Sequence, residues 1–243
     1  YIVTWHRLTC RYLRSSSFAA CLDNDTRTAR NRHITGLHIL STIKDPKVLL
    51  HVLLTICGLA PTTALWLYAP TIIGSFGYGR LQANALVSVG QWISVCLIII
   101  AAFVATGRRG FVVLFGVFCQ WTFMVAFRAL PDSSSAGLKF GIVTMGTATC
   151  SWWHSVNGSW LSINASCPEK RAIRMAIFIM AANCAGIVGG QLFRSDDFPY
   201  YHRGWTIIAV LMSIALSAFL LVEMIVVLGR YKLEATDDSD LDV

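Results

Sequence analysis

The stretch VLLHVLLTICGLAPTTALWLYAPTII, residues 48–73, contains no Asp, Glu, Lys or Arg. An α-helix needs about 20 predominantly apolar residues to cross the hydrocarbon core of a bilayer, and this stretch exceeds that length. We therefore interpret residues 48–73 as a membrane-spanning helix.

Five further apolar stretches of comparable length follow, and short loops connect them. They are residues 83–106, 110–127, 140–161, 175–193 and 204–228, of which the last carries one acid, Glu223. The sequence thus predicts an all-α membrane protein with six transmembrane helices in residues 48–228. Residues 1–47 are interpreted as a cytosolic linker and residues 229–243 as an acidic cytosolic tail.

Composition and charge support lipid as the solvent of this chain. Of its 243 residues, 55% are apolar and 14% are charged, and the net charge is +7. A soluble domain has about 25% charged residues, so a water-soluble enzyme and a disordered chain are both disfavoured. With six spans, both termini lie on the same side of the membrane, and fifteen of the twenty Lys and Arg lie in the segments on that side. This bias predicts a multi-pass protein with both termini in the cytosol, and it explains the basic charge without nucleic acid.

No feature of the sequence indicates a cofactor, a metal site or an enzyme. The eight cysteines form no C-x-x-C pair, and five of them lie within predicted spans, which is typical of apolar packing residues. His154 and Ser159 lie on one helix, without the G-x-S-x-G pattern of a hydrolase. We therefore expect neither metal nor catalysis.

The fourth predicted span carries the most informative polar residues. Trp153, Asn157 and Trp160 follow a spacing of i, i+4 and i+7, which places them on one stripe of a helix, and His154 lies beside it. Amides and indoles facing lipid would be costly, so this stripe is expected to face the bundle interior or a watery cavity. Two interpretations remain: the stripe binds a flat organic anion, or it forms hydrogen bonds between helices. His154 is equally compatible with a structural role and with proton handling.

Other spans add weaker candidates. Gln91 on the second span, Gln120 on the third and Asn183 on the fifth could line a pathway. The predicted substrate-binding set is therefore Trp153, His154, Asn157, Trp160, Asn183, Gln91 and Gln120.

Small residues and prolines suggest how the helices pack. Ala182, Gly186 and Gly190 recur every four residues and predict a ridge for close helix approach. Pro61 and Pro70 indicate either an interrupted helix at a solute pathway or a plain kink.

Several motifs, in order along the chain, resemble one family. They are Leu67–Ile73, Phe76-Gly77-Tyr78, the loop Thr106–Gly110, Trp153–Asn164 and Met175–Gln191. Together they resemble the seventh to eleventh helices of fungal major facilitator permeases, specifically the allantoate and nicotinic acid permease group of anion:cation symporters.

The resemblance implies the C-terminal half of a major facilitator fold. It implies proton-coupled uptake of a small organic anion by alternating access, at a site between two six-helix halves. The expected partners are the lipid bilayer, the anion, a proton and a missing N-terminal six-helix half, and the expected location is the plasma membrane. The alternative is a truncated membrane protein that does not transport.

Overall fold

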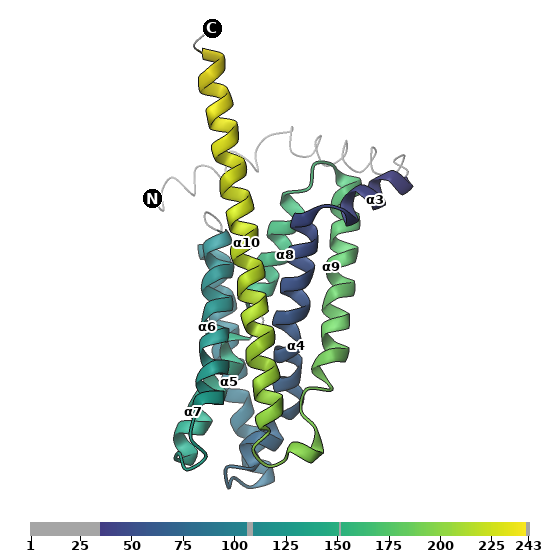
Figure 1. Cartoon of the computed structure of the whole chain (residues 1–243). Coiled ribbons are helices and arrows are strands. Elements are labelled where there is room, and N and C mark those ends of the chain that lie inside the picture. The colour runs from purple at the N-terminus through teal and green to yellow at the C-terminus, as the bar shows by residue number, and fades with distance from the viewer. Residues whose placement is uncertain (1–34, 106–108, 151, 242–243) are drawn as a thin grey trace, which may run out of the picture.

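A computed structural model of the chain describes residues 35–105, 109–150 and 152–241, with side chains up to residue 226. The described residues form helices joined by short loops, without a strand among them (Figure 1). The elements are α3 (Gly36–Ile43), α4 (Pro46–Gly74), α5 (Arg80–Val104), α6 (Arg109–Ala129), α7 (Ala136–Thr149), α8 (Trp152–Ile163), α9 (Pro168–Gly189), η1 (Ser195–Asp197) and α10 (His202–Leu241).

Helix α4 is the centre of the bundle. It packs against α9 and α10, and α10 packs in turn on α6. Helix α5 contacts α4, α7 and α8, and it shares no substantial contact with α9. The bundle has two ends, which we call the α3 end and the η1 end; α3 and the last turns of α10 lie at the same end in Figure 1. Helices α5 and α9 therefore flank α4 and α8 from opposite sides.

Five helices are long and apolar enough to cross a membrane: α4, α5, α6, α9 and residues 202–226 of α10. They match five of the six predicted spans, and the largest difference is at the start of α9, which begins at Pro168 where the prediction had residue 175. The all-α membrane protein predicted from the sequence is confirmed. Residues 1–34 of the predicted linker and Arg108 of the predicted inner loop lie outside the described residues.

The remaining predicted span, the fourth along the chain with residues 140–161, is not one helix. It consists of α7 and α8, which are separated by an extended backbone at Cys150. No Gly or Pro marks this break. The Thr149 hydroxyl instead donates to the carbonyls of Met145 and Gly146, so part of the backbone left unpaired at the end of α7 is satisfied locally.

The prolines of α4, in contrast, do not interrupt the helix. Both Pro61 and Pro70 lie inside a continuous α4. Near Pro61 the carbonyl of Gly58 accepts hydrogen bonds from the Thr62 hydroxyl and from the Gln120 amide of α6. The carbonyl that loses its donor to Pro61 is that of Cys57, so these bonds lie at the next residue of the same turn, where they tie α6 to α4.

The small-residue ridge of α9 is displaced by one residue from the prediction. The ridge buried against α4 is Ala181, Ala185 and Gly189, whereas a Cβ on Gly186 would meet no atom within 4 Å. A Cβ on Gly189 would lie 2.5 Å from the backbone oxygen of Ala60. The predicted ridge Ala182–Gly186–Gly190 is therefore wrong, because two overlapping small-residue patterns exist and only one faces α4.

Helix α10 extends well beyond the bundle (Figure 1). Its 40 residues correspond to about 60 Å at 1.5 Å per residue, twice the thickness of a bilayer core. The part predicted as a tail, from residue 229, continues this helix as far as Leu241.

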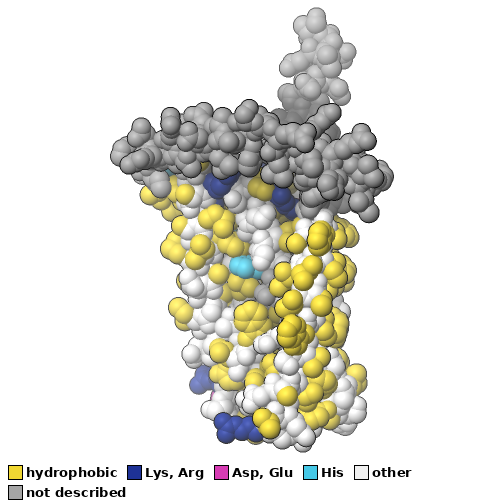
Figure 2. Space-filling view, turned by 180° about the vertical axis from the view of Figure 1, so that it is seen from behind, with side chains coloured by type: hydrophobic (Ala, Val, Ile, Leu, Met, Phe, Trp, Pro, Cys, Tyr) yellow, Lys and Arg dark blue, Asp and Glu magenta, His cyan; other side chains and the backbone are white. Residues whose placement is uncertain are grey.

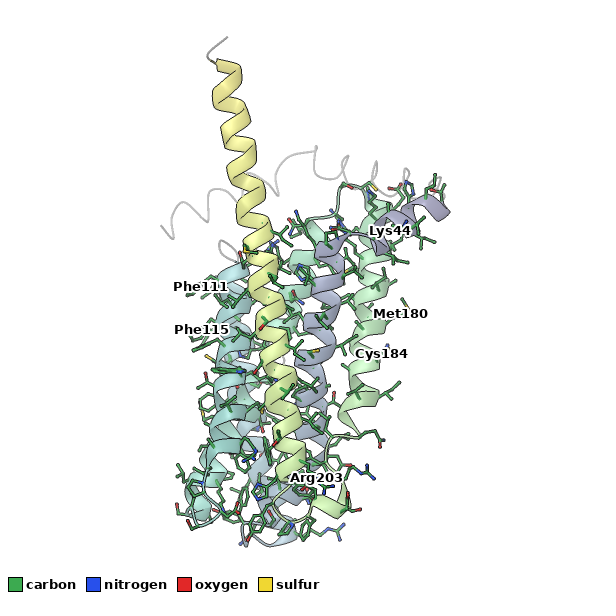
Figure 3. The ribbon with its side chains drawn as sticks, viewed as in Figure 1. Lys44, Phe111, Phe115, Met180, Cys184 and Arg203 are labelled. Carbon is green, nitrogen blue, oxygen red and sulfur yellow. The ribbon has the colours of Figure 1, made fainter. Side chains whose placement is uncertain are left out.

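The outer surface of the bundle is apolar between its two ends. In Figure 2, Lys and Arg lie near the two ends of the visible face and hydrophobic side chains cover much of the belt between them. Phe111 and Phe115 on α6, and Met180 and Cys184 on α9, point away from the bundle (Figure 3). Such a belt is stable against lipid or another apolar surface, not against water.

Candidate functional site

Helix α8 contains the predicted stripe, and its two sides differ sharply. One side is buried against α4 and α6, and the other is exposed between α5 and α9. The polar residues of the first side form two hydrogen-bonded clusters.

The first cluster joins α8 to α4 through Asn157. Asn157 is fully buried, and its Oδ1 lies 2.7 Å from Nδ1 of His51. Because an amide oxygen only accepts, Nδ1 of His51 donates in this arrangement. The Asn157 amide also donates a long bond of 3.5 Å to the Thr55 hydroxyl, and the His51 ring stands edge-on to Trp160 at 5.2 Å. Sequence reasoning did not identify His51, because a single His in an apolar run shows no periodic signal.

The second cluster joins α8 to α6 and α4 through Trp153. The Trp153 indole donates to Oε1 of Gln120 at 2.7 Å, and the Gln120 amide donates to the Thr62 hydroxyl at 3.0 Å. Gly58 and Gly116 make room for Trp153: a Cβ on either glycine would lie within 2.6 Å of its side chain. The indole therefore fills a slot between α4 and α6.

These two clusters match the interhelical interpretation of the stripe. Trp153, Asn157 and Gln120 have no exposed surface in this structure, and their polar atoms bond to neighbouring helices. The clusters fix the packing of α4, α6 and α8. Whether the same residues also contact a solute stays a prediction.

His154 and Trp160 are only half-buried. The His154 ring stacks on Phe178 of α9, with ring centres 4.5 Å apart and planes inclined by 11°. Its Nδ1 is buried and has no hydrogen-bond partner. His154 therefore lies at the α8–α9 contact, next to the exposed side of α8, and its Nδ1 makes no hydrogen bond.

Gln91 and Asn183 lie on exposed faces of α5 and α9. The structure therefore divides the predicted set: three residues are buried in the clusters, two are half-buried on α8, and two lie on the flanking helices.

The exposed side of α8 carries hydroxyl groups that sequence reasoning missed. Ser155 and Ser159 are exposed and lie one turn apart, and together they form what we call the serine strip. They line a hollow of about 280 Å³ between α5 and α8, whose walls include Arg109 at the start of α6. Hydroxyls and a guanidinium are suitable donors for a carboxylate. The i, i+4 spacing of Ser155 and Ser159 places both on one face of a helix, but serine is common in membrane helices, so this spacing alone is a weak signal.

An ion pair links α9 to α4 at the α3 end of the bundle, near the first cluster. Arg174 of α9 and Asp45, which caps α4 by accepting from the Lys47 amide, are 2.8 Å apart. Their side chains are 10% and 23% exposed. The pair ties the start of α9 to the start of α4. Within the part of the chain that the structure describes, no group of three His, Cys, Asp or Glu could hold a metal ion.

Comparison with known proteins identifies fungal transporters as relatives of this chain. It is 27% identical over 139 residues to an uncharacterized transporter of Saccharomyces cerevisiae, a match that covers 56% of this chain and 26% of the relative. It is 21% identical over 158 residues to the MFS-type transporter cnsO of Penicillium expansum, covering 61% and 29%. It is 26% identical over 152 residues to the thiamine pathway transporter THI73 of Saccharomyces cerevisiae, covering 61% and 28%.

The matches cover between a quarter and a third of the length of these three relatives. No family model matches the chain, and no solved structure matches it significantly.

Proposed function

We propose that this chain is one six-helix half of a secondary active transporter, and that it carries a small organic anion by alternating access. The observation that carries the proposal is the serine strip with Arg109, on the side of α8 that α5 and α9 leave uncovered. The likeness to longer transporters, of which each match covers less than a third, supports the idea that other parts of a transporter cover this side.

The second half of the site is assigned to an N-terminal six-helix bundle. In facilitator folds the solute binds between two halves that rock against each other. The apolar faces of α5 and α9 would contact that bundle, and the hydroxyls between them would line the solute path. Figure 2 is consistent with this arrangement: on the face opposite α10, a paler band containing a histidine lies between two hydrophobic columns.

A carboxylate is the proposed chemical class of the solute. The strip offers two hydroxyl donors and the hollow offers one cation. Three donors around a small space complement the two acceptor oxygens of a carboxylate. Gln91 and Asn183 belong to the proposed site as donors and acceptors on the two flanking helices.

His154 is the proposed proton carrier. A coupling group must exchange its proton with a watery path, and His154 is half-buried next to the serine strip with a free nitrogen. His51 is buried and already bonded to Asn157, so we assign it a structural role. The plasma membrane location and the cytosolic position of both ends belong to the same proposal, on the basis of the charge bias.

The test is solute uptake by the full-length gene product in proteoliposomes with an imposed pH gradient. Labelled nicotinate, allantoate and pantothenate represent carboxylates, and thiamine represents a cation. We expect uptake of at least one carboxylate, stimulated by an inward proton gradient and abolished by a protonophore. Uptake of thiamine alone would contradict the anion assignment, and no uptake of any solute would favour a membrane protein that does not transport.

Proton coupling is tested by His154→Gln, with His51→Gln as the matched variant. We expect His154→Gln to keep uptake down a solute gradient and to lose its dependence on the pH gradient. His51→Gln should lower the yield of folded protein while the remaining protein stays coupled. The opposite pattern would transfer the proton role to His51.

A further inference from the structure

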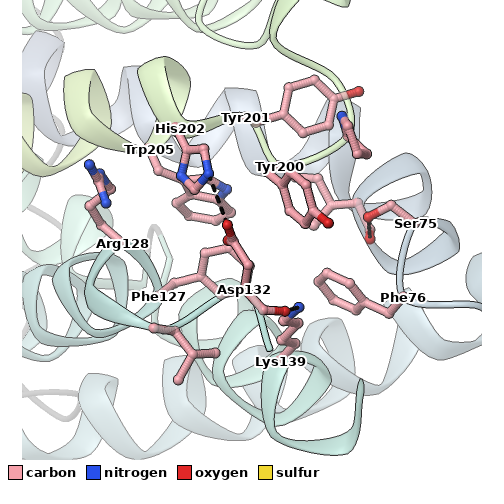
Figure 4. Close-up of a pocket in the computed structure, with 13 residues that line it drawn as sticks. Ser75, Phe76, Phe127, Arg128, Asp132, Lys139, Tyr200, Tyr201, His202 and Trp205 are labelled. Carbon is pink, nitrogen blue, oxygen red and sulfur yellow. Dashed lines mark hydrogen bonds and ion pairs between the residues drawn. The ribbon is translucent and has the colours of Figure 1, made fainter. Parts of the chain in front are cut away.

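A second pocket lies at the η1 end of the bundle, and none of its lining residues belongs to α8. It has a volume of about 110 Å³ and lies between the end of α4, the α6–α7 loop and the start of α10. Figure 4 shows Phe76, Phe127 and Tyr200 around it, with Trp205 behind the pair formed by His202 and Asp132. Neither the uptake proposal nor the clusters of α8 use this pocket.

Its framework is fixed by α10 and by the loop that precedes it. The Asp197 carboxylate accepts from the backbone amides of Arg203 and Gly204 at 2.8 and 3.0 Å, which caps the first turn of α10. The Phe127 and Trp205 rings pack against each other, with centres 4.1 Å apart and planes inclined by 36°. These contacts hold the aromatic wall in place without a ligand.

One polar group in this wall has no partner. Trp205 is 2% exposed, and its indole N–H is buried without a hydrogen-bond acceptor. A buried donor without an acceptor costs about 1–3 kcal/mol, and such a group in a native protein calls for an acceptor that the chain itself does not provide. Trp205 is one of the residues that line the pocket, so an acceptor bound there would lie beside this indole.

The charges around the pocket favour an anion. Arg128 and Lys139 are both at its rim, and the only acid in its lining, Asp132, lies 3.4 Å from His202. Lys139 uses one N–H on the Asp132 backbone oxygen at 2.6 Å and keeps two further donors. Burial raises the pKa of the Tyr201 phenol, so this pocket residue stays a neutral hydroxyl. Donors and positive charge therefore exceed acceptors.

The volume limits the size of the ligand. A cavity of about 150 Å³ accepts a benzene ring. A pocket of 110 Å³ is smaller and holds a short aliphatic carboxylate, or the carboxylate end of a larger molecule whose remainder stays outside.

We propose that this pocket binds a small carboxylate through the Trp205 indole N–H and the Lys139 ammonium. Given the orientation in the proposed function, on which this role rests, the η1 end faces the outside of the cell. The pocket is then a docking site at which the anion is held before it reaches the serine strip.

Binding is tested on the full-length gene product in lipid nanodiscs by saturation-transfer NMR, with propionate as the probe. Propionamide is the neutral probe of the same shape, and tetramethylammonium is the cationic probe. We expect saturable binding of propionate only. No saturable propionate signal, or binding of tetramethylammonium in its place, would overturn the proposal.

Variants then locate the site. Trp205→Phe keeps the ring and removes the donor, and Lys139→Gln removes the charge from a side chain that is not part of the core. Each should weaken propionate binding at least about fivefold, because one charge-assisted or buried hydrogen bond is lost. Arg194→Gln, at a 76% exposed loop position outside the pocket, is the control and should leave binding unchanged. Unchanged binding in Lys139→Gln would refute the site even if Trp205→Phe fails to fold.

The two proposals fail in different ways. Propionate binding that is lost in the pocket variants, in a protein that transports no solute, would support the pocket and contradict the transport function. Normal carboxylate uptake with an unchanged KM in Lys139→Gln would support transport and contradict the docking role. Propionate binding lost in Ser155→Ala/Ser159→Ala and kept in the pocket variants would place the anion at the serine strip alone.

Discussion

Helix α8 presents one polar side to α4 and α6 and another to the uncovered space between α5 and α9. On the buried side, Asn157 and Trp153 bond to His51 and Gln120. On the exposed side, Ser155 and Ser159 line a hollow together with the cation Arg109. Polar residues within one turn of a membrane helix can therefore have two different roles. Those that are hydrogen-bonded to other helices hold the bundle together, and those without such bonds remain available to a solute.

The difference lies in the partners, not in the residue types. A buried amide whose hydrogen bonds are all made inside the bundle has little to offer a ligand unless that packing opens. An exposed hydroxyl bonds readily to a solute or to water, because its donor rotates freely. The comparison thus predicts that substitutions on the buried side change stability and that those on the exposed side change affinity.

The strongest test of the buried framework is the contact between α9 and α4. Gly189→Ala places a methyl group 2.5 Å from the Ala60 carbonyl oxygen, so the two backbones must separate. We expect the free energy of unfolding to fall by about 3 kcal/mol, at the upper end for overpacking. Reversible unfolding in SDS, after purification in mild detergent, measures this change.

Gly186→Ala is the matched control, because a Cβ there meets no atom within 4 Å. It should be neutral or slightly stabilising, since Ala favours helix over Gly by about 1 kcal/mol. Equal losses in both variants would mean that the ridge predicted from the sequence also packs in the native protein.

Gln120 provides the next largest effect. Gln120→Leu leaves the Trp153 indole N–H and the Thr62 hydroxyl without their partner. We expect a loss of about 1–2 kcal/mol, a range between values for buried groups in water-soluble proteins and those in membranes. Gln91→Leu, on the exposed face of α5, should change the SDS unfolding free energy by less than about 0.5 kcal/mol. A larger loss for Gln91 would reverse the assignment of the two amides.

The ion pair at the α3 end should contribute less. Arg174→Gln breaks the contact with Asp45, whose side chain is 23% exposed, so water screens part of the interaction. We expect a loss of about 1 kcal/mol, which is well below the cost for a fully buried pair. Arg171→Gln removes the same charge from the exposed side of the same turn and should leave the unfolding free energy unchanged. Salt should shrink the difference between the two variants.

Most of the fold follows from the length of apolar stretches, which is a strong and local signal. Five predicted spans are helices, although α9 begins earlier than predicted, at Pro168, and α10 continues to Leu241. The break at Cys150 was not predictable from helix-breaking residues, because no Gly or Pro stands there and the Thr149 hydroxyl instead donates to the carbonyls of Met145 and Gly146. Pro61, in contrast, suggested an interruption, but α4 continues through it, and the adjacent Gly58 carbonyl accepts hydrogen bonds from Thr62 and Gln120.

The candidate site was only partly predictable for a related reason. Spacing determines which residues share a face, and Trp153 and Asn157 do face the same way, toward α4 and α6. It does not determine which neighbour lies opposite that face. The same limit explains the ridge on α9, where two small-residue patterns differ by one position and α4 selects the one with Gly189. Contacts between helices far apart in sequence decide these questions.

The smallest effect on stability is expected on the exposed side, where the substitutions should change affinity. In Ser155→Ala/Ser159→Ala, two hydroxyl donors to a carboxylate are lost, each of which contributes about 0.5–1.5 kcal/mol. We expect KM for carboxylate uptake to rise about 5- to 150-fold, while the SDS unfolding free energy stays within about 0.5 kcal/mol because neither side chain is buried. Ser217→Ala, an exposed serine on α10 whose hydroxyl bonds to its own helix, should change neither quantity. An unchanged KM combined with a loss of stability would show that the serine strip belongs to the packing of the bundle, and the contrast between the two sides of α8 would disappear.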